Sequence, residues 1–203
     1  DPDASVAVIL LRRSVAHDPE PVDGKFCLHT LGTFSASNGG LDLMVDQWAR
    51  KQAVQVLKYL AARAGHPVHR EELVELLWPD SDDEKHARQR LKVAVHFLRS
   101  RLRDAGLPDD LVATEGSTYT LDARQVWIDA KAFEHHAAEG RAHERGGRDA
   151  DAIREYEEAR RLYRGDFFEA DRYADWCAEE RARLSEIHLD ALIRLAGRLV
   201  AKG

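Results

Sequence analysis

The fold of this chain is decided by residues 78–106, WPDSDDEKHARQRLKVAVHFLRSRLRDAG, which predict one long helix over residues 84–103. Ser81 and Glu84 have the spacing of a capping box, in which both side chains accept backbone N–H groups at the start of a helix. Gly106 provides the left-handed residue that commonly ends a helix. Apolar residues recur at the spacing that turns one stripe of a helix towards a core. They are Ala87, Leu91, Ala94, Val95, Leu98 and Leu102.

The remaining face of this predicted helix is basic. Residues 84–103 hold seven Lys or Arg and one acid, a balance of +6, whereas the whole chain carries −6. Such a helix suits a groove lined by phosphates. A basic face is by itself more often a solvated surface, so the interpretation depends on the rest of the sequence.

Positive charge is concentrated in the middle of the chain. Residues 1–49 balance to −4, residues 50–103 to +5 and residues 104–203 to −7. The 203 residues, 44% hydrophobic and 33% charged, suffice for one large or two ordinary soluble domains. A basic island between acidic flanks indicates a nucleic-acid module joined to a part that does not touch nucleic acid.

Disulfide scaffolds and membrane proteins are disfavoured by the sequence. Cys27 and Cys177 lie far apart and outside any CxxC or metal-ligand spacing, which indicates buried thiols in a reducing compartment. The apolar run 6–11 is much shorter than the roughly 20 residues that a membrane span needs. We therefore expect a cytoplasmic protein without membrane contact.

A metal site or an enzyme is also not indicated. His135, Glu139 and His143 share one helical face, but no further ligand follows, so a solvated face is the simpler interpretation. We expect neither a metal nor another cofactor. The sequence has no Walker loop, GxSxG or HExxH motif, and we therefore expect a protein that is not an enzyme.

The order of predicted elements from residue 25 onward is that of a winged helix. Residues 1–24 are interpreted as a linker or the end of an upstream domain. Residues 25–45 alternate around the turn cluster 37–40, which predicts short antiparallel strands. Next come helices over 50–64, 70–77 and 84–103, then a hairpin with strands at 111–114 and 119–121. Three helices followed by a hairpin predict a winged helix-turn-helix domain over residues 25–124.

The pattern changes to helical hairpins over residues 125–203. Predicted helices over 131–144, 150–163 and 174–202 resemble tetratricopeptide units, which present a concave surface to partner proteins. The predicted fold is therefore mainly α with a small β-sheet and wing, a winged helix-turn-helix domain followed by tetratricopeptide-like helical hairpins. Four tryptophans near element boundaries are expected to fill small cores. They are Trp48, Trp78, Trp127 and Trp176.

An ordered series of motifs resembles the bacterial transcriptional activator family typified by the Streptomyces antibiotic regulatory proteins. The motifs are LGTF (31–34), RKQAVQVLKYLA (50–61), REELVELLWPD (70–80), ARQRLKVAVHFLRSRL (87–102), EGSTYTLD (115–122), RLYRGDF (161–167) and YADW (173–176). The resemblance implies an OmpR-like winged helix that binds DNA, followed by a helical bacterial transcriptional activator domain. It also implies that helix 84–103 enters the major groove and that residues 115–120 form the wing. Since that second domain usually continues further, the chain is expected to be a fragment of a larger regulator.

Individual side chains can then be assigned to DNA. Gln89 suits adenine, Lys92 suits guanine and Val93 suits the thymine methyl group, and His96 lies on the same face. Basic or hydroxyl side chains around this face suit phosphates, which position a protein without reading sequence. These predicted phosphate contacts are Arg50, Lys51, Lys85, Arg88, Arg99, Ser100, Arg103 and Thr118.

The sequence therefore predicts a DNA-binding transcription regulator, an activator that recognises double-stranded DNA. The expected partners are a second copy of the chain on repeated half-sites and RNA polymerase. The alternative is a protein-interaction module whose winged helix has lost DNA binding, because Thr118 and Thr120 stand where family wings often carry glycine and arginine.

Overall fold

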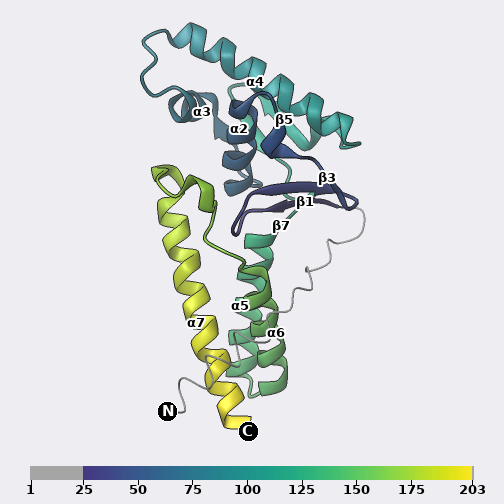
Figure 1. The fold of residues 1–203 in the computed structure, drawn as a ribbon, viewed down its shortest axis with the longest axis vertical. Coiled ribbons are helices and arrows are strands. Elements are labelled where there is room, and N and C mark those ends of the chain that lie inside the picture. The colour runs from purple at the N-terminus through teal and green to yellow at the C-terminus, as the bar shows by residue number, and fades with distance from the viewer. Residues whose placement is uncertain (1–24, 203) are drawn as a thin grey trace.

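The computed structural model describes residues 25–202, so the linker predicted for residues 1–24 lies outside the described residues. Figure 1 shows helix α4 across one end of the molecule, helices α5, α6 and α7 at the other end, and a small sheet between them. The helices are α2 (Lys51–Ala62), α3 (Arg70–Leu77), α4 (Glu84–Asp104), α5 (Asp129–Arg145), α6 (Asp149–Leu162) and α7 (Ala178–Lys202). The strands are β1 (Phe26–His29), β2 (Ser35–Asn38), β3 (Leu41–Asp42), β4 (Val68–His69), β5 (Val112–Glu115), β6 (Thr118–Leu121) and β7 (Val126–Ile128).

The first sheet has the strand order β3-β2-β1-β7. The predicted antiparallel strands are confirmed, with Phe26 opposite Asn38 and a glycine turn at Gly39-Gly40 between β2 and β3. Strand β7 was not predicted, and it pairs in parallel with β1, Phe26 opposite Val126. Because β7 follows residue 124 and leads straight into α5, the sheet extends past the predicted domain boundary. The division between residues 124 and 125 stays a prediction.

The winged helix-turn-helix arrangement is confirmed. All six apolar residues predicted to anchor α4 are buried, and α3 has its predicted bounds. Strand β6 pairs with both β5 and β4, so the wing is part of a three-stranded sheet, order β4-β6-β5, and β4 was not foreseen. Gly106 has a φ of 79°, the left-handed geometry predicted for the end of the helix.

The predicted capping box at the start of α4 is wrong. Asp83 is the N-cap, and its Oδ1 accepts from the backbone N–H of His86 at 2.9 Å. The Ser81 hydroxyl instead donates to the Asp83 carbonyl at 3.4 Å. Because α4 begins at Glu84, Ser81 lies too far ahead of the first turn to cap it.

Helices α5, α6 and α7 form the predicted helical hairpins. Gly140 of α5 lies against the buried ring of Tyr156 on α6, which lets the two helices approach closely. Tyr156 donates to Glu144 at 2.8 Å, and Arg194 and Arg198 of α7 also bind this carboxylate. Burial would raise the pKa of Glu144, but these hydrogen bonds from Arg198, Tyr156 and Arg194 lower it to about 2.

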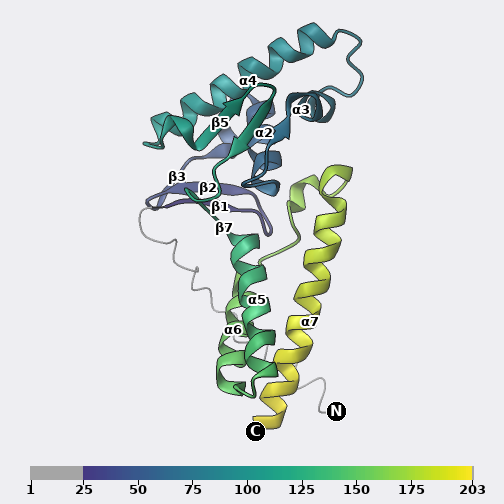
Figure 2. The same cartoon turned by 180° about the vertical axis from the view of Figure 1, so that it is seen from behind.

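One hydrophobic core runs through both parts of the chain. It includes Leu91 of α4, Phe26 of β1, Phe133 of α5 and Phe168 of the α6–α7 connection. Buried Asp129, at the start of α5, accepts from the backbone N–H of Thr30 and of Leu31, at 2.7 and 3.1 Å. The winged helix and the helical part are thus packed as one body, as the two views in Figures 1 and 2 also show.

Two further findings concern the cysteines and the helices of residues 25–202. Cys27 and Cys177 are both buried thiols, as predicted, and burial raises the pKa of each. Among these residues, none of the helices combines the length and the apolar character needed to cross a membrane.

Candidate nucleic-acid interface

Helix α4 presents a polar face at the surface of the molecule because its apolar stripe is held in the core. Leu91 and Leu98 are 1% and 0% exposed, so the opposite side of the helix must face outward. All four predicted base-reading residues are exposed there: Gln89, Lys92, Val93 and His96. Val93, an apolar side chain among these polar ones, is 38% exposed. With 21 residues the helix is roughly 30 Å long.

Several of the predicted phosphate-binding arginines already have partners in the protein. Arg88 pairs with Glu84 and lies 3.5 Å from a Glu71 oxygen. Arg99 donates to the Val112 carbonyl and to the Thr114 hydroxyl, which fastens α4 to β5. Arg103 Nε donates to Asp109 at 2.7 Å. Exposed ion pairs contribute little free energy, so Arg103, which is exposed, can exchange its partner for a phosphate more easily than Arg88 and Arg99, which are both half-buried.

The remaining predicted phosphate contacts lie at three places. Lys85 is exposed on the first turn of α4, and Ser100 is half-buried near its end. Arg50 and Lys51 lie at the start of α2, where no side chain caps the helix and no acid occupies the first turn. The positive end of the α2 dipole is therefore not offset locally, which suits a nearby anion.

Thr118 lies on the wing, and its hydroxyl already has a partner within the protein. Its hydroxyl donates to the Glu115 carbonyl at 2.9 Å across the wing turn. The backbone N–H of Arg70 donates to the Ser117 carbonyl, which ties the wing tip to the start of α3. A contact between Thr118 and a phosphate stays a prediction, and it requires the hydroxyl to turn away from Glu115.

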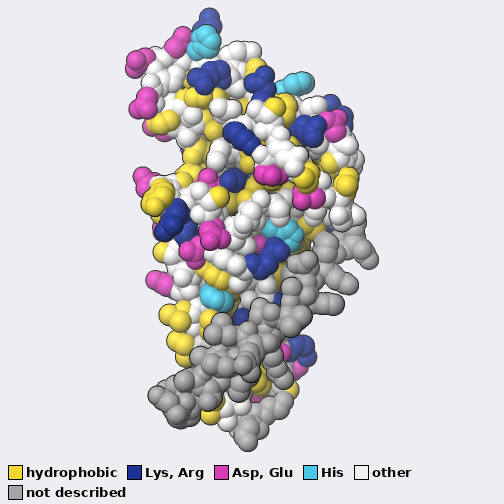
Figure 3. Space-filling view, viewed as in Figure 1, with side chains coloured by type: hydrophobic (Ala, Val, Ile, Leu, Met, Phe, Trp, Pro, Cys, Tyr) yellow, Lys and Arg dark blue, Asp and Glu magenta, His cyan; other side chains and the backbone are white. Residues whose placement is uncertain are grey.

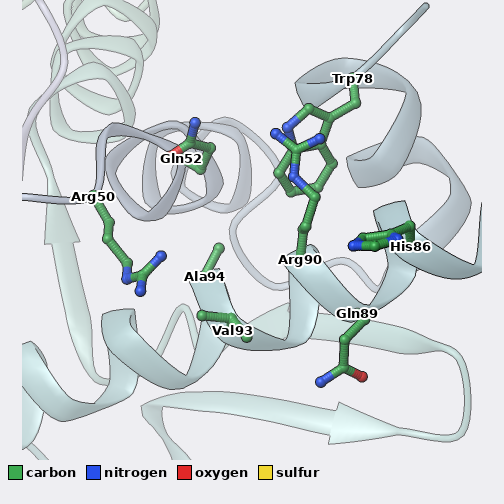
Figure 4. Close-up of a pocket in the computed structure, with 8 residues that line it drawn as sticks. All are labelled: Arg50, Gln52, Trp78, His86, Gln89, Arg90, Val93 and Ala94. Carbon is green, nitrogen blue, oxygen red and sulfur yellow. The ribbon is translucent and has the colours of Figure 1, made fainter. Parts of the chain in front are cut away.

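The structure adds residues to which the sequence assigned no part in DNA binding. Arg90 of α4 lies over the ring of Trp78, with its guanidinium carbon 4.4 Å from the ring centroid. Together with Arg50 and Gln52 of α2 these residues line a hollow of about 350 Å³ (Figure 4). Trp78 was expected only to fill a core, and Arg90 was counted as a charge without a role. Helical periodicity gave no signal for this pairing, because Trp78 reaches α4 only through the packing of the chain after α3.

The other three tryptophans pack as expected of structural residues. Trp48 is buried and meets Phe97 edge-on, Trp127 meets His29, and Trp176 lies against Tyr59. Within residues 25–202 no group of three or more His, Cys, Asp or Glu side chains is placed to hold a metal ion.

Charge is distributed unevenly over this end of the molecule. Figure 3 shows Lys and Arg side chains spread over the region of α4, with acidic side chains near the connection between α3 and α4. Asp82 and Asp83 in this connection are exposed. A polyanion is therefore attracted to the length of α4 and repelled from the α3–α4 connection.

Comparisons with known proteins follow the division seen in the fold. Residues 48–121 match the family model of the C-terminal domain of transcriptional regulatory proteins, and residues 128–203 match that of the bacterial transcriptional activator domain. Comparison with curated proteins found no match.

A solved structure shares the architecture of most of this chain. It is titled Mycobacterium tuberculosis EmbR in complex with low affinity phosphopeptide, and it aligns with a TM-score of 0.76 at 23% sequence identity. The alignment covers 88% of this chain and 46% of that one, so the chain spans about half the length of the structure it matches. At this identity the likeness shows a common fold.

Proposed function

We propose that this chain, in which an OmpR-like winged helix precedes a bacterial transcriptional activator domain, is a transcription regulator that binds double-stranded DNA with sequence preference. In this proposal α4 lies in the major groove, which is wide enough to admit an α-helix. Gln89, Lys92, Val93 and His96 contact base edges, and the surrounding basic side chains contact phosphates. The chain is proposed to act as an activator.

The observation that carries the proposal is the division of α4 into two faces. Six buried apolar residues fix the rotation of the helix, and this rotation leaves Gln89, Lys92 and Val93 exposed together. An amide, an ammonium and a methyl-bearing side chain provide three different means of reading a major groove.

Two features support contact with partner proteins. The helical part belongs to a bacterial transcriptional activator domain, and helix α7 exposes Leu189, Ile193 and Val200 along one side. On these grounds we predict that two copies pair on repeated half-sites and that the chain contacts RNA polymerase. A protein-interaction module without DNA binding is the alternative that the following experiment can reveal.

The reading face can be tested by substitution in the full chain. A duplex selected from a randomised pool by the wild-type chain is compared with a scrambled duplex of the same composition, using fluorescence anisotropy. We expect Gln89→Ala and Lys92→Ala each to reduce the ratio of the two affinities, because a good base contact provides about 1–3 kcal/mol of discrimination. Melting temperatures should stay close to that of the wild type, since both side chains are exposed.

Lys131→Ala is the matched control, because Lys131 is an exposed lysine of α5 far along the chain from α4. It should change neither the affinity nor the ratio. If Gln89→Ala and Lys92→Ala both keep the wild-type ratio, the reading face is misplaced. If the wild-type chain selects no duplex at all, the DNA-binding proposal fails and the interaction module is favoured.

A further inference from the structure

The hollow beside α4 is lined without any acidic side chain. It lies between the start of α2, the ring of Trp78 and the flank of α4 (Figure 4). Arg50 and Arg90 border it from two sides, His86 borders it from the first turn of α4, and Val93 and Ala94 lie between them. Two guanidinium groups around one hollow create a strongly positive site that favours an anion.

Arg90 is held in place without being neutralised. Its guanidinium lies 4.4 Å from the Trp78 ring centroid, a distance at which a cation is attracted to the face of an indole. Among residues 25–202, no carboxylate forms an ion pair with Arg90 or with Arg50. Stacking leaves the N–H groups at the edge of the guanidinium plane available as donors. The side chain is therefore positioned before any ligand arrives, which reduces the entropy lost on binding.

Arg50 faces the same hollow from the other helix. Its guanidinium carbon lies 6.0 Å from the ring of Phe97, and the side chain is exposed. Gln52, in the first turn of α2, adds an amide that can donate a hydrogen bond. Donors from two helices thus border one hollow, an arrangement that suits a tetrahedral oxyanion with several acceptor oxygens.

We propose that the Arg50–Arg90 pocket binds a phosphate group of the DNA backbone at the edge of the groove that α4 enters. This inference rests on the proposed function and adds to it a site whose ligand is a phosphodiester. The two arginines and the Trp78 ring lie where α4 meets α2 and the chain after α3, and Gln89 of α4 also lines the pocket (Figure 4). The phosphate is placed between Arg50 and Arg90, and the neighbouring base edge at Gln89. Arg90 then fixes the depth and rotation of α4 without reading sequence.

The first test measures affinity against salt concentration for the full chain. Arg90→Gln should weaken binding to the selected and to the scrambled duplex by the same factor. The slope of log affinity against log salt should become less steep by about 0.9, the value for one phosphate contact on a duplex. Arg90→Lys should keep the wild-type slope because it keeps the charge. Arg101→Gln, an exposed arginine of the same helix that lies 3.6 Å from Asp104, serves as the matched control and should change the slope much less.

The second test locates the phosphate. Duplexes in which one phosphate at a time is replaced by an uncharged methylphosphonate are titrated with the wild type and with Arg90→Gln. One position should weaken the wild type but have no further effect on Arg90→Gln. If instead the two proteins respond alike at every position, the pocket does not hold a DNA phosphate.

A site for free phosphate would behave differently. Inorganic phosphate at constant ionic strength would then raise the melting temperature of the wild type but not of Arg90→Gln, while both proteins bound DNA with the same salt slope. That result overturns the assignment to DNA. If the wild-type chain binds no duplex, both proposals fail. If the wild type binds DNA and Arg90→Gln shows the same slope of log affinity against log salt, only the assignment of the pocket fails.

Discussion

His188 of α7 is half-buried against aromatic rings and lacks a hydrogen-bond partner at one nitrogen. Its ring stacks on Tyr163 with centroids 4.0 Å apart and nearly parallel planes, and Phe133 lies beside it. Nδ1 is buried without a partner among the described residues. Burial lowers the pKa of His188, and the positive charge of Arg160 lowers it further, against a smaller opposite effect of Asp166. The folded chain therefore favours the neutral ring.

This lowered pKa predicts a loss of stability in mild acid. As pH falls below about 6.5, the unfolded chain binds a proton at His188 before the folded chain does, so the free energy of unfolding decreases. The decrease amounts to about 1.4 kcal/mol for each unit by which the pKa is lowered. Urea unfolding at several pH values between about 7.5 and 5.5 measures it.

The matched variant is His188→Phe, which keeps an aromatic ring in the stack and removes the titrating group. Its stability should depend less on pH over the same range. A variant whose pH dependence equals that of the wild type would show that His188 is not held neutral.

At the scale of elements, the contact between α5 and α6 depends on a position without a side chain. A Cβ atom added to Gly140 would lie 2.5 Å from Cε1 of Tyr156, much closer than two carbon atoms can pack. Tyr156 cannot easily move, because it is fully buried and its hydroxyl binds Glu144. Gly140 therefore sets the distance between the two helices.

We expect Gly140→Ala to lower the free energy of unfolding by about 1–3 kcal/mol through overpacking. Gly197→Ala on α7 is the control, since a Cβ there meets nothing within 4 Å and alanine favours a helix by up to about 1 kcal/mol. The two substitutions should thus have opposite signs in chemical denaturation. A stabilised Gly140→Ala variant would mean that α5 and α6 are less closely packed than described.

At the scale of the whole molecule, Asp129 joins the two parts. It is fully buried, and it accepts hydrogen bonds from the Thr30 N–H and hydroxyl, both at 2.7 Å, and from the Leu31 N–H. The loop after β1 is also bound from the other side, because the N–H of Phe168 donates to the Thr30 carbonyl at 2.8 Å. Lys58 of α2 adds an ion pair with Asp171 at 2.6 Å. The orientation of the winged helix is therefore coupled to the helical part.

Asp129→Ala should lower the free energy of unfolding by at least about 2 kcal/mol, because it leaves buried backbone donors without acceptors. Thr30→Val removes only one of these donors and should cost less. Calorimetry should show a single transition for the wild type and a broadened or divided one for Asp129→Ala. Asp109→Ala, at an exposed carboxylate, is the control and should stay within about 0.5 kcal/mol of the wild type. A cooperative Asp129→Ala variant of wild-type stability would contradict the coupling.

The elements of this protein could be predicted from the sequence because their causes are local. Leu91, Leu98 and Leu102 follow the helical period, and the period alone indicates which side of α4 faces outward. The bounds of α3 follow from Trp78-Pro79, and the left-handed end of α4 follows from Gly106. The order of motifs then identified the winged helix and the domain after it.

Only the tertiary structure decided how distant segments meet. The pairing of β7 with β1, the contact of Asp129 with Thr30 across 99 residues and the stacking of Arg90 on Trp78 each join segments whose own sequences carry no sign of the partner. The N-cap of α4 was also decided there, since Ser81 and Asp83 are both good caps and a small difference in free energy selects between them. Local periodicity determines which face of a helix is buried, whereas a site built from several elements depends on the packing of the whole chain.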